Sequence, residues 1–130
     1  MYTKQVLDHF RNPRNLGALK NSDAIGQKGN PACGDVMKIY LKVGSRDGDG
    51  TAKQEYIQDI RFETLGCAAA IAVSSLLTEA AKGKSLKEAK AITKNRIIED
   101  AGGLPPAKIH CSMLGIDALR EAIDNYQQSK

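Results

Sequence analysis

Apolar and polar residues alternate along two stretches in the first half of this chain, and the alternation predicts strands. In residues 36–43 the apolar residues Met37, Ile39, Leu41 and Val43 alternate with Val36, Lys38, Tyr40 and Lys42. A period of two residues is typical of a half-buried strand. Residues 56–65 form a second such run, with one face made by Tyr56, Ile60 and Phe62. Because residues 44–50 are polar and glycine-rich, the two strands should form an antiparallel hairpin. Residues 22–31 are a weaker strand candidate, since they contain two glycines.

Helical spacing of apolar residues precedes and follows this hairpin. Residues 2–10 carry a short apolar stripe, and we expect His9 to take a polar, solvated position on that helix. Residues 68–81 are rich in Ala and Leu and predict a helix with a buried stripe. The last helix should start near Cys111 or Ser112 and present one apolar side.

Capping and breaking residues divide the segment between the two long helices. Ser85 and Glu88 have the spacing of a capping box, so a helix should begin at Ser85. A further short helix is expected over residues 93–101, closed by two glycines. Residues 104–108 should be extended, because each proline biases the residue before it away from the α region.

The order of these elements indicates the fold class. A helix, two or three strands and then several helices predict an α+β fold, with a small antiparallel sheet of about three strands and helices packed on one face. A chain of 130 residues is expected to form one domain, residues 1–130. A domain of this size can bury enough surface to fold without a metal or a disulfide.

Composition excludes several classes of function. The net charge of +4 is modest, and a solvated helix face accounts for the loose lysine group, Lys82, Lys84, Lys87 and Lys90. No aromatic residues interleave with these lysines, so no nucleic-acid partner is expected. No apolar run approaches the roughly 20 residues of a membrane span, so no membrane partner is expected either. The absence of an opening signal peptide and the odd count of three cysteines predict a cytoplasmic protein without structural disulfides.

The three cysteines are the main candidates for soft-metal chemistry, and each is predicted at the end of an element. Cys33 precedes the first clear strand, Cys67 follows the second and opens a helix, and Cys111 lies at the start of the last helix. The hairpin should bring the strand ends near Cys33 and Cys67 to one edge of the sheet. A helix N-terminus lowers the pKa of a thiol and so favours the metal-binding thiolate.

Two further ligand candidates adjoin the cysteines. Asp35 lies two residues after Cys33, and alternate residues of a strand share a face. His110 precedes Cys111 and offers a nitrogen ligand. Three thiolates with one carboxylate or imidazole could complete a four-ligand site for a soft or borderline metal. From the residues alone, the alternatives are inert buried cysteines and a structural His110, whereas a Cys–His hydrolase is disfavoured because sequence neighbours do not face each other.

At these residues the chain resembles the IscU/NifU-type iron–sulfur cluster assembly scaffolds over nearly its whole length. The matching segments are Asn12-Pro13-Arg14-Asn15, Pro31-Ala32-Cys33-Gly34-Asp35, Gly66-Cys67, Leu104-Pro105-Pro106-Ala107-Lys108 and His110-Cys111-Ser112. The resemblance implies an α+β fold and a stand-alone scaffold rather than an enzyme. On such a scaffold a labile [2Fe–2S] cluster is assembled from iron and desulfurase-derived sulfur and is then transferred to apo-proteins.

The resemblance also implies roles for individual residues. Cys33, Cys67 and Cys111 are the implied cluster ligands, and the fourth is Asp35 or His110. Cys111 is the implied persulfide acceptor, and Asp35 is associated with release of the cluster. Stable ferredoxin clusters are held by four cysteines, so three cysteines and one harder ligand suit a site that must lose its cluster again.

The implied partners are a cysteine desulfurase and apo iron–sulfur proteins, and a homodimer could form through a shared cluster. A segment resembling the docking site for an Hsp70-type chaperone consists of Leu104, Pro105, Pro106, Ala107 and Lys108. The family pattern has valine where this chain has Ala107, so chaperone use is an open question.

The same donor atoms could hold Zn²⁺ in place of a cluster. The alternative functions are therefore a zinc-dependent sulfurtransferase that accepts persulfide sulfur at Cys111, and a protein whose zinc is purely structural. Asp35 beside the site favours the scaffold, as does the lack of a long insert between Cys67 and Cys111.

Overall fold

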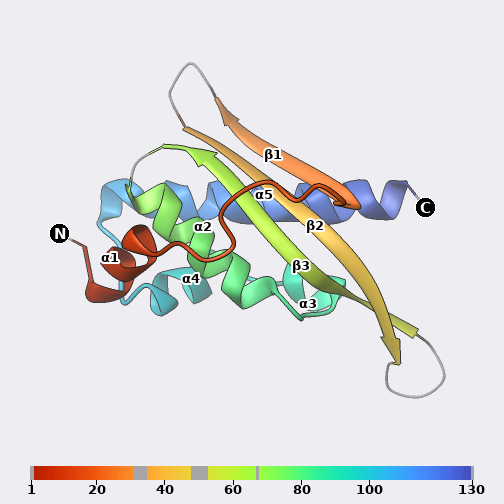
Figure 1. Ribbon diagram of the computed structural model, residues 1–130. Coiled ribbons are helices and arrows are strands. Elements are labelled where there is room, and N and C mark those ends of the chain that lie inside the picture. The colour runs from red at the N-terminus through yellow and green to blue at the C-terminus, as the bar shows by residue number, and fades with distance from the viewer. Residues whose placement is uncertain (1, 31–34, 48–52, 67, 130) are drawn as a thin grey trace.

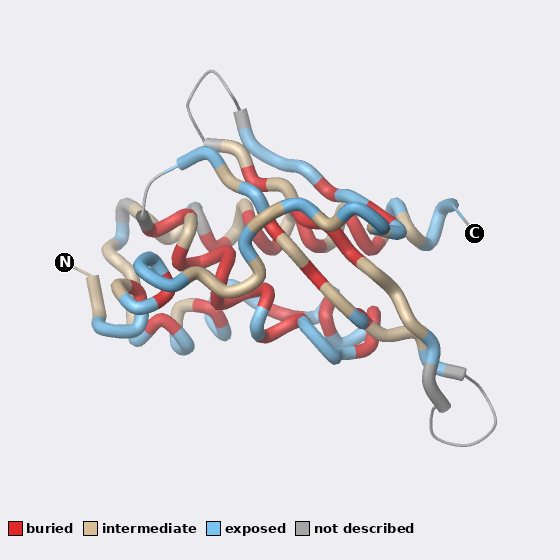
Figure 2. Tube along the Cα trace, in the orientation of Figure 1, coloured by how far each residue is buried: buried red, intermediate tan, exposed pale blue. Residues whose placement is uncertain are grey.

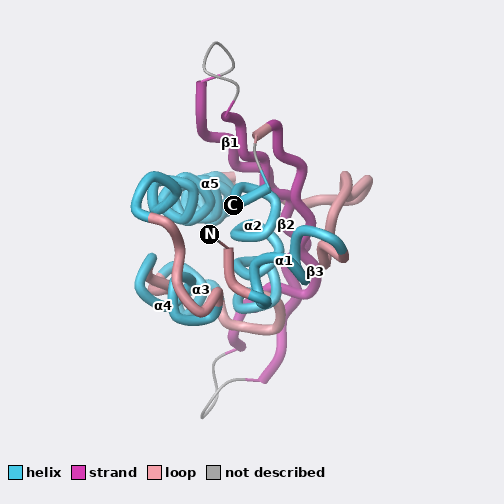
Figure 3. Tube along the Cα trace, turned by 90° about the vertical axis from the view of Figure 1, so that its left-hand side faces the viewer, coloured by secondary structure: helices cyan, strands magenta, loops and turns pink. Residues whose placement is uncertain are grey.

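The computed structural model describes residues 2–30, 35–47, 53–66 and 68–129. It contains a three-stranded sheet, and Figure 3 shows α2, α3, α4 and α5 together on one side of that sheet. In chain order the elements are α1 (Lys4–Arg11), β1 (Ala24–Asn30), β2 (Asp35–Asp47), β3 (Lys53–Leu65), α2 (Ala68–Ala81), α3 (Leu86–Lys90), α4 (Lys94–Asp100), the 3₁₀ turn η2 (Pro106–Lys108) and α5 (Ile109–Gln128). Figure 1 labels the α-helices and the strands. The predicted α+β class is confirmed.

The sheet is antiparallel throughout, in the order β1-β2-β3. Asn30 at the end of β1 pairs with Asp35 at the start of β2, and Val36 pairs with Leu65 at the end of β3. The end of β1, the start of β2 and the end of β3 therefore meet at one end of the sheet.

The face of the sheet toward the helices forms the hydrophobic core, because alternate strand residues point to it. Its fully buried strand residues include Met37, Ile39, Leu41, Ile60 and Phe62. Buried residues concentrate where α2 and α5 meet the sheet (Figure 2), and almost every described side chain of α2 is buried. The Ala-rich sequence of α2 allows this close packing, since small side chains fit between the sheet and the neighbouring helices.

The segment between α1 and β1 crosses the opposite face of the sheet, as Figure 1 shows. It begins at the outer edge of β3, where the Gly17 N–H donates to the Phe62 carbonyl at 2.8 Å. It ends beside β2, where the Asp23 N–H donates to the Leu41 carbonyl at 2.6 Å. The end of the sheet at Val36 and Leu65 lies outside this crossing.

An irregularity in the hairpin corrects one strand prediction. The register shifts between Lys42 and Val43, which face Asp59 and Ile57 respectively. The extra residue in β3 reverses the alternation, so Ile57 is buried in place of the predicted Tyr56. Both strands are also longer than predicted, since β2 continues to Asp47 and β3 begins at Lys53. Cross-strand pairing therefore extends into a segment whose composition predicted a loop.

The helix caps follow the sequence closely. Ser85 Oγ accepts from the Glu88 N–H while Glu88 accepts from the Ser85 N–H, which confirms the capping box. Thr93 caps α4 through the Arg96 N–H. None of the helices that the structure describes is long and apolar enough to cross a bilayer.

The proline segment and the start of α5 differ from the prediction. Pro105 is extended, but residues 106–108 form a 3₁₀ turn in which the Lys108 N–H donates to the Pro105 carbonyl at 2.8 Å. Pro106 is not followed by another proline, so its backbone is free to turn. The turn leads directly into α5, which begins at Ile109 rather than near Cys111 or Ser112.

Candidate metal centre

The strand ends place two of the predicted ligand segments together. β2 begins at Asp35, and its second residue, Val36, pairs with Leu65. Gly66 follows Leu65, and α2 begins at Ala68. The backbone that flanks Cys33 and the backbone that flanks Cys67 therefore meet at the same end of the sheet, as the hairpin predicted (Figure 1).

The first turns of α5 approach this end of the sheet as well. A Cβ added at Gly115 would lie 3.9 Å from Met37 Cε and 3.2 Å from Leu77 Cδ2, so α5 packs here against both β2 and α2. Ser112 is buried, and its Oγ donates to the Ile109 carbonyl at 2.6 Å, which holds the first turn of α5. His110 and Cys111 belong to that turn, and His110 is exposed.

A buried contact ties the start of β2 to α2. Ser74 Oγ lies 2.6 Å from Met37 Sδ and donates to the Ala70 carbonyl at 2.7 Å. The Ala70 carbonyl therefore satisfies the Ser74 hydroxyl in a dry environment, where an unpaired hydroxyl would be costly. The contact fixes the strand that begins at Asp35 against the helix that follows Cys67.

The predicted thiolates themselves lie largely outside the described part of the chain. Cys33 and Cys67 are outside the described residues, and of Asp35 and Cys111 the structure describes the backbone alone. Among the side chains that are described, no three His, Cys, Asp or Glu residues cluster as a metal site. That the five candidate ligands lie close enough to bind one metal centre is therefore a prediction.

Helix electrostatics favours thiolates at both helix starts. α2 begins directly after Cys67, and the first turn of α5 contains Cys111. Neither first turn contains an acidic residue. The positive ends of the two helix dipoles are thus not offset there by carboxylates, and such an environment lowers the pKa of a nearby thiol.

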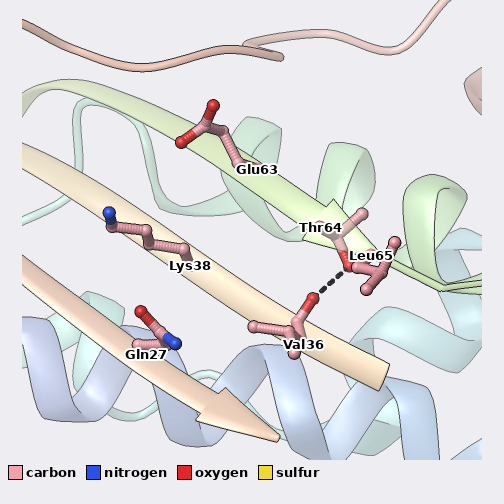
Figure 4. A pocket seen from close by; sticks show the side chains of 6 residues that line it. All are labelled: Gln27, Val36, Lys38, Glu63, Thr64 and Leu65. Atoms are coloured by element: carbon pink, nitrogen blue, oxygen red, sulfur yellow. Dashed lines mark hydrogen bonds between the residues drawn. The ribbon is translucent and has the colours of Figure 1, made fainter. Parts of the chain in front are cut away.

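A surface cavity that the alternation did not predict lies beside the same sheet end, on the face opposite the helices. It measures about 430 Å³ and is lined by Gln27, Val36, Lys38, Glu63, Thr64 and Leu65, as Figure 4 shows. Leu65 is 61% exposed, the highest exposed fraction among the exposed large apolar side chains of the described residues.

Polar contacts order the floor of this cavity. Thr64 Oγ1 donates to the Val36 carbonyl at 2.6 Å, which is the dashed line in Figure 4. The Tyr40 hydroxyl donates to the Glu63 carboxylate, and this hydrogen bond raises the pKa of Tyr40. Lys38 Nζ lies 5.1 Å from the centre of the Tyr40 ring, within the range of a cation–π contact.

His9 is buried, which corrects the prediction that it is solvated. It is 8% exposed; its Nδ1 lies 2.7 Å from Ser75 Oγ and its Nε2 lies 3.3 Å from Glu79 Oε1. Burial is the main cause that lowers its pKa, and the charge of Arg14 adds to that effect. The imidazole therefore joins α1 to α2 and has a structural role.

Comparisons with known proteins agree with the resemblance. The family model for the NifU-like N terminal domain matches residues 1–130. The chain is 52% identical over 126 residues to the iron–sulfur cluster assembly scaffold protein IscU 1 of Archaeoglobus fulgidus, covering 97% of this chain and 76% of that protein. It is 48% identical over 132 residues to the IscU of Escherichia coli K12, covering 99% and 96%.

A solved structure has the same fold. It is described as a scaffold protein for the SUF system from Fervidobacterium islandicum AW-1, and it superposes with a TM-score of 0.69 at 24% identity, covering 94% of this chain and 96% of that chain. At that identity the likeness concerns the fold alone. The family model and the curated relatives span almost the whole chain, and the chain therefore belongs to the family of NifU-like N-terminal domains.

Proposed function

We propose that this protein is a scaffold on which a labile [2Fe–2S] cluster is assembled and from which it is transferred to apo-proteins. Relatives at about half identity carry the name of iron–sulfur cluster assembly scaffold. The observation that carries the proposal is the meeting of β1, β2, β3, α2 and α5 at one end of the sheet, because these elements adjoin or contain every candidate ligand.

The cluster is cargo in this proposal, and the donor set suits that role. Cys33, Cys67 and Cys111 supply three thiolates, which are the usual protein ligands of iron–sulfur clusters. Asp35 or His110 supplies the fourth donor. An oxygen or nitrogen ligand in place of a fourth thiolate is expected to exchange more readily, so the cluster can leave.

Sulfur would enter through Cys111. Its thiolate attacks the outer sulfur of a persulfide on a cysteine desulfurase, the S–S bond of the donor breaks, and the donor cysteine leaves as a thiolate. The product is a persulfide on Cys111, with no net oxidation or reduction. The position of Cys111 in the first turn of α5 supports this role, since the helix dipole favours the attacking thiolate.

The chaperone-like segment has a defined anchor. Leu104 is half-buried and packs against the core, whereas Pro106 is exposed at the start of η2. An anchored turn with an exposed proline loses little entropy on binding, which supports docking of a partner at residues 104–108. The proposal includes an Hsp70-type chaperone as that partner, a cytoplasmic location and no turnover chemistry.

Anaerobic reconstitution with iron and sulfide tests the function. The expected product is a brown protein with about two iron and two sulfide ions per bound cluster. Transfer to an apo-ferredoxin should then be seen as the acceptor's own spectrum. A colourless protein that retains one zinc and takes up neither iron nor sulfide would contradict the scaffold proposal and favour the zinc alternative.

A further inference from the structure

Two side chains of α5 form hydrogen bonds with the backbone at the outer edge of β1. The Gln27 N–H donates to Glu121 Oε2 at 3.0 Å, and Asn125 Nδ2 donates to the Ile25 carbonyl at 2.8 Å. Glu121 and Asn125 are four residues apart and so lie on one face of the helix. Each side chain thus bonds one backbone group that β1, at the edge of the sheet, would otherwise present to solvent.

Between these two hydrogen bonds, β1 lies against the backbone of α5. A Cβ added at Gly26 would lie 2.1 Å from the Ala118 carbonyl oxygen and 2.5 Å from the Ala122 nitrogen. Such an approach is open only to glycine. We call Gly26, Glu121 and Asn125 the β1–α5 clamp. The close approach at Gly26 sets the distance between strand and helix, and the two hydrogen bonds keep the strand from sliding along the helix.

The clamp joins the two elements that lead to the candidate site. From Gly26, β1 runs on to Asn30, which pairs with Asp35. From Ala118, α5 runs back roughly two turns to Cys111 and His110. Strand and helix are stiff over these lengths, so a shift at the clamp moves Asp35 relative to the first turn of α5.

We propose that the β1–α5 clamp is a positioning device for the cluster, and that Glu121 and Asn125 set how long the cluster stays bound without contacting it. This inference rests on the proposed function. Both hydrogen bonds are exposed to solvent and thus contribute little to overall stability. Their effect is on geometry, as with outer partners that orient the ligands of a metal.

Two variants break the clamp, and two controls match them. Glu121→Ala removes the acceptor for Gln27, and Asn125→Asp is isosteric but replaces the donor to Ile25 with a carboxylate. Glu121→Gln keeps an acceptor oxygen while removing the charge, which also pairs with Lys28 at 3.8 Å. Asp124→Asn, on the same helix as Glu121, removes an exposed ion pair with Lys90 of α3 and leaves the two hydrogen bonds to β1 in place.

The first readout uses the protein without cluster. Amide exchange at Gln27 should become at least about fivefold faster in Glu121→Ala, as expected for loss of one hydrogen bond, and stay within about twofold in Glu121→Gln. This result tests the clamp even if no cluster binds, so failure of the inference and failure of the proposed function are distinguishable. Unchanged exchange in Glu121→Ala would overturn the clamp.

The second readout uses the loaded protein, followed by visible circular dichroism and by loss of the cluster to a chelator. Glu121→Ala and Asn125→Asp should alter the dichroism and shorten the lifetime by about tenfold, the lower end for loss of an outer-shell partner. Glu121→Gln and Asp124→Asn should match the parent. The proposal would be overturned if both clamp variants had the dichroism and the cluster lifetime of the parent. It would also be overturned if self-association were the only change in these variants, because the two hydrogen bonds would then serve only to protect the edge of β1.

Discussion

Val36 pairs with Leu65 across β2 and β3, one residue after β2 begins at Asp35 and one residue before Gly66. This pairing brings together chain positions that are far apart in sequence and adjoin two of the three cysteines. The packing of α5 at Gly115 beside Met37 and Leu77 adds the first turns of α5 to the same end of the molecule. The described backbone next to Cys33 and Cys67 and the first turns of α5 therefore lie at one end of the molecule, and we predict that the five candidate ligands converge there.

Replacing Cys33, Cys67 or Cys111 by serine should abolish stable cluster binding and leave the domain folded. The core is built from aliphatic residues of the sheet, α2 and α5, so folding does not depend on the metal. Visible absorption after reconstitution measures the first effect, and far-ultraviolet circular dichroism without metal measures the second. An unfolded Cys67→Ser variant would mean that this cysteine is part of the core.

Replacing Asp35 by alanine should make the bound cluster longer-lived. A carboxylate that competes for iron or admits an incoming ligand promotes release, and alanine removes it. The measurement is the rate of cluster transfer to an apo-ferredoxin, with Asp100→Ala as the control because Asp100 pairs with Arg96 on α4. Equal transfer rates in the parent and Asp35→Ala would exclude Asp35 from release.

His9 should make folding stability depend on pH. Its pKa is lowered in the folded state, mainly by burial, so the unfolded chain binds the proton first as the pH falls below about 6.5. Stability is therefore complete above that pH and decreases toward the lower pKa of the folded state. Asp8, Arg14, Ser75 and Glu79 surround the imidazole and act together on this equilibrium.

Urea midpoints between pH 7.5 and 5.5 measure this dependence. His9→Gln should flatten the decrease, because the variant has no imidazole between α1 and α2 that must take up a proton. A decrease of the same steepness in His9→Gln as in the parent would show that the assignment to His9 is wrong.

Gly26→Ala should destabilise the fold by at least about 1–3 kcal/mol, because the new Cβ would meet the backbone of α5 rather than a movable side chain. Gly115→Ala is the control: its Cβ would meet the end of Leu77 at 3.2 Å, and alanine is favoured over glycine in a helix by about 1 kcal/mol. Chemical denaturation of both variants measures the difference. Equal stability of the two variants would show that the close approach of β1 and α5 imposes no constraint.

Local rules predicted much of the fold. The capping box at Ser85 could be predicted from two residues three positions apart, and α2 has the bounds that its composition indicated. The alternation in β2 predicted its buried face correctly. The order of elements was enough to predict the α+β class.

The errors come from contacts between distant residues. His9 is buried because its ring nitrogens contact Ser75 and Glu79 of α2, and no local pattern in α1 predicts these contacts. Ile57 replaces Tyr56 in the core because of a bulge that depends on pairing with β2. For the candidate site, the hairpin pattern predicted that the strand and helix ends converge. The cavity beside Leu65 could not be predicted, because its lining residues come from three different strands.

The most direct test of the scaffold account is a structure of the cluster-loaded protein obtained without oxygen. The account predicts that the sulfur atoms of Cys33, Cys67 and Cys111 all bind the irons of one [2Fe–2S] cluster, at the sheet end where Asp35 pairs with Asn30. It also predicts that Asp35 or His110 supplies the remaining ligand. Cysteine sulfurs that face separate regions of the protein, or a single zinc ion in place of the cluster, would contradict it.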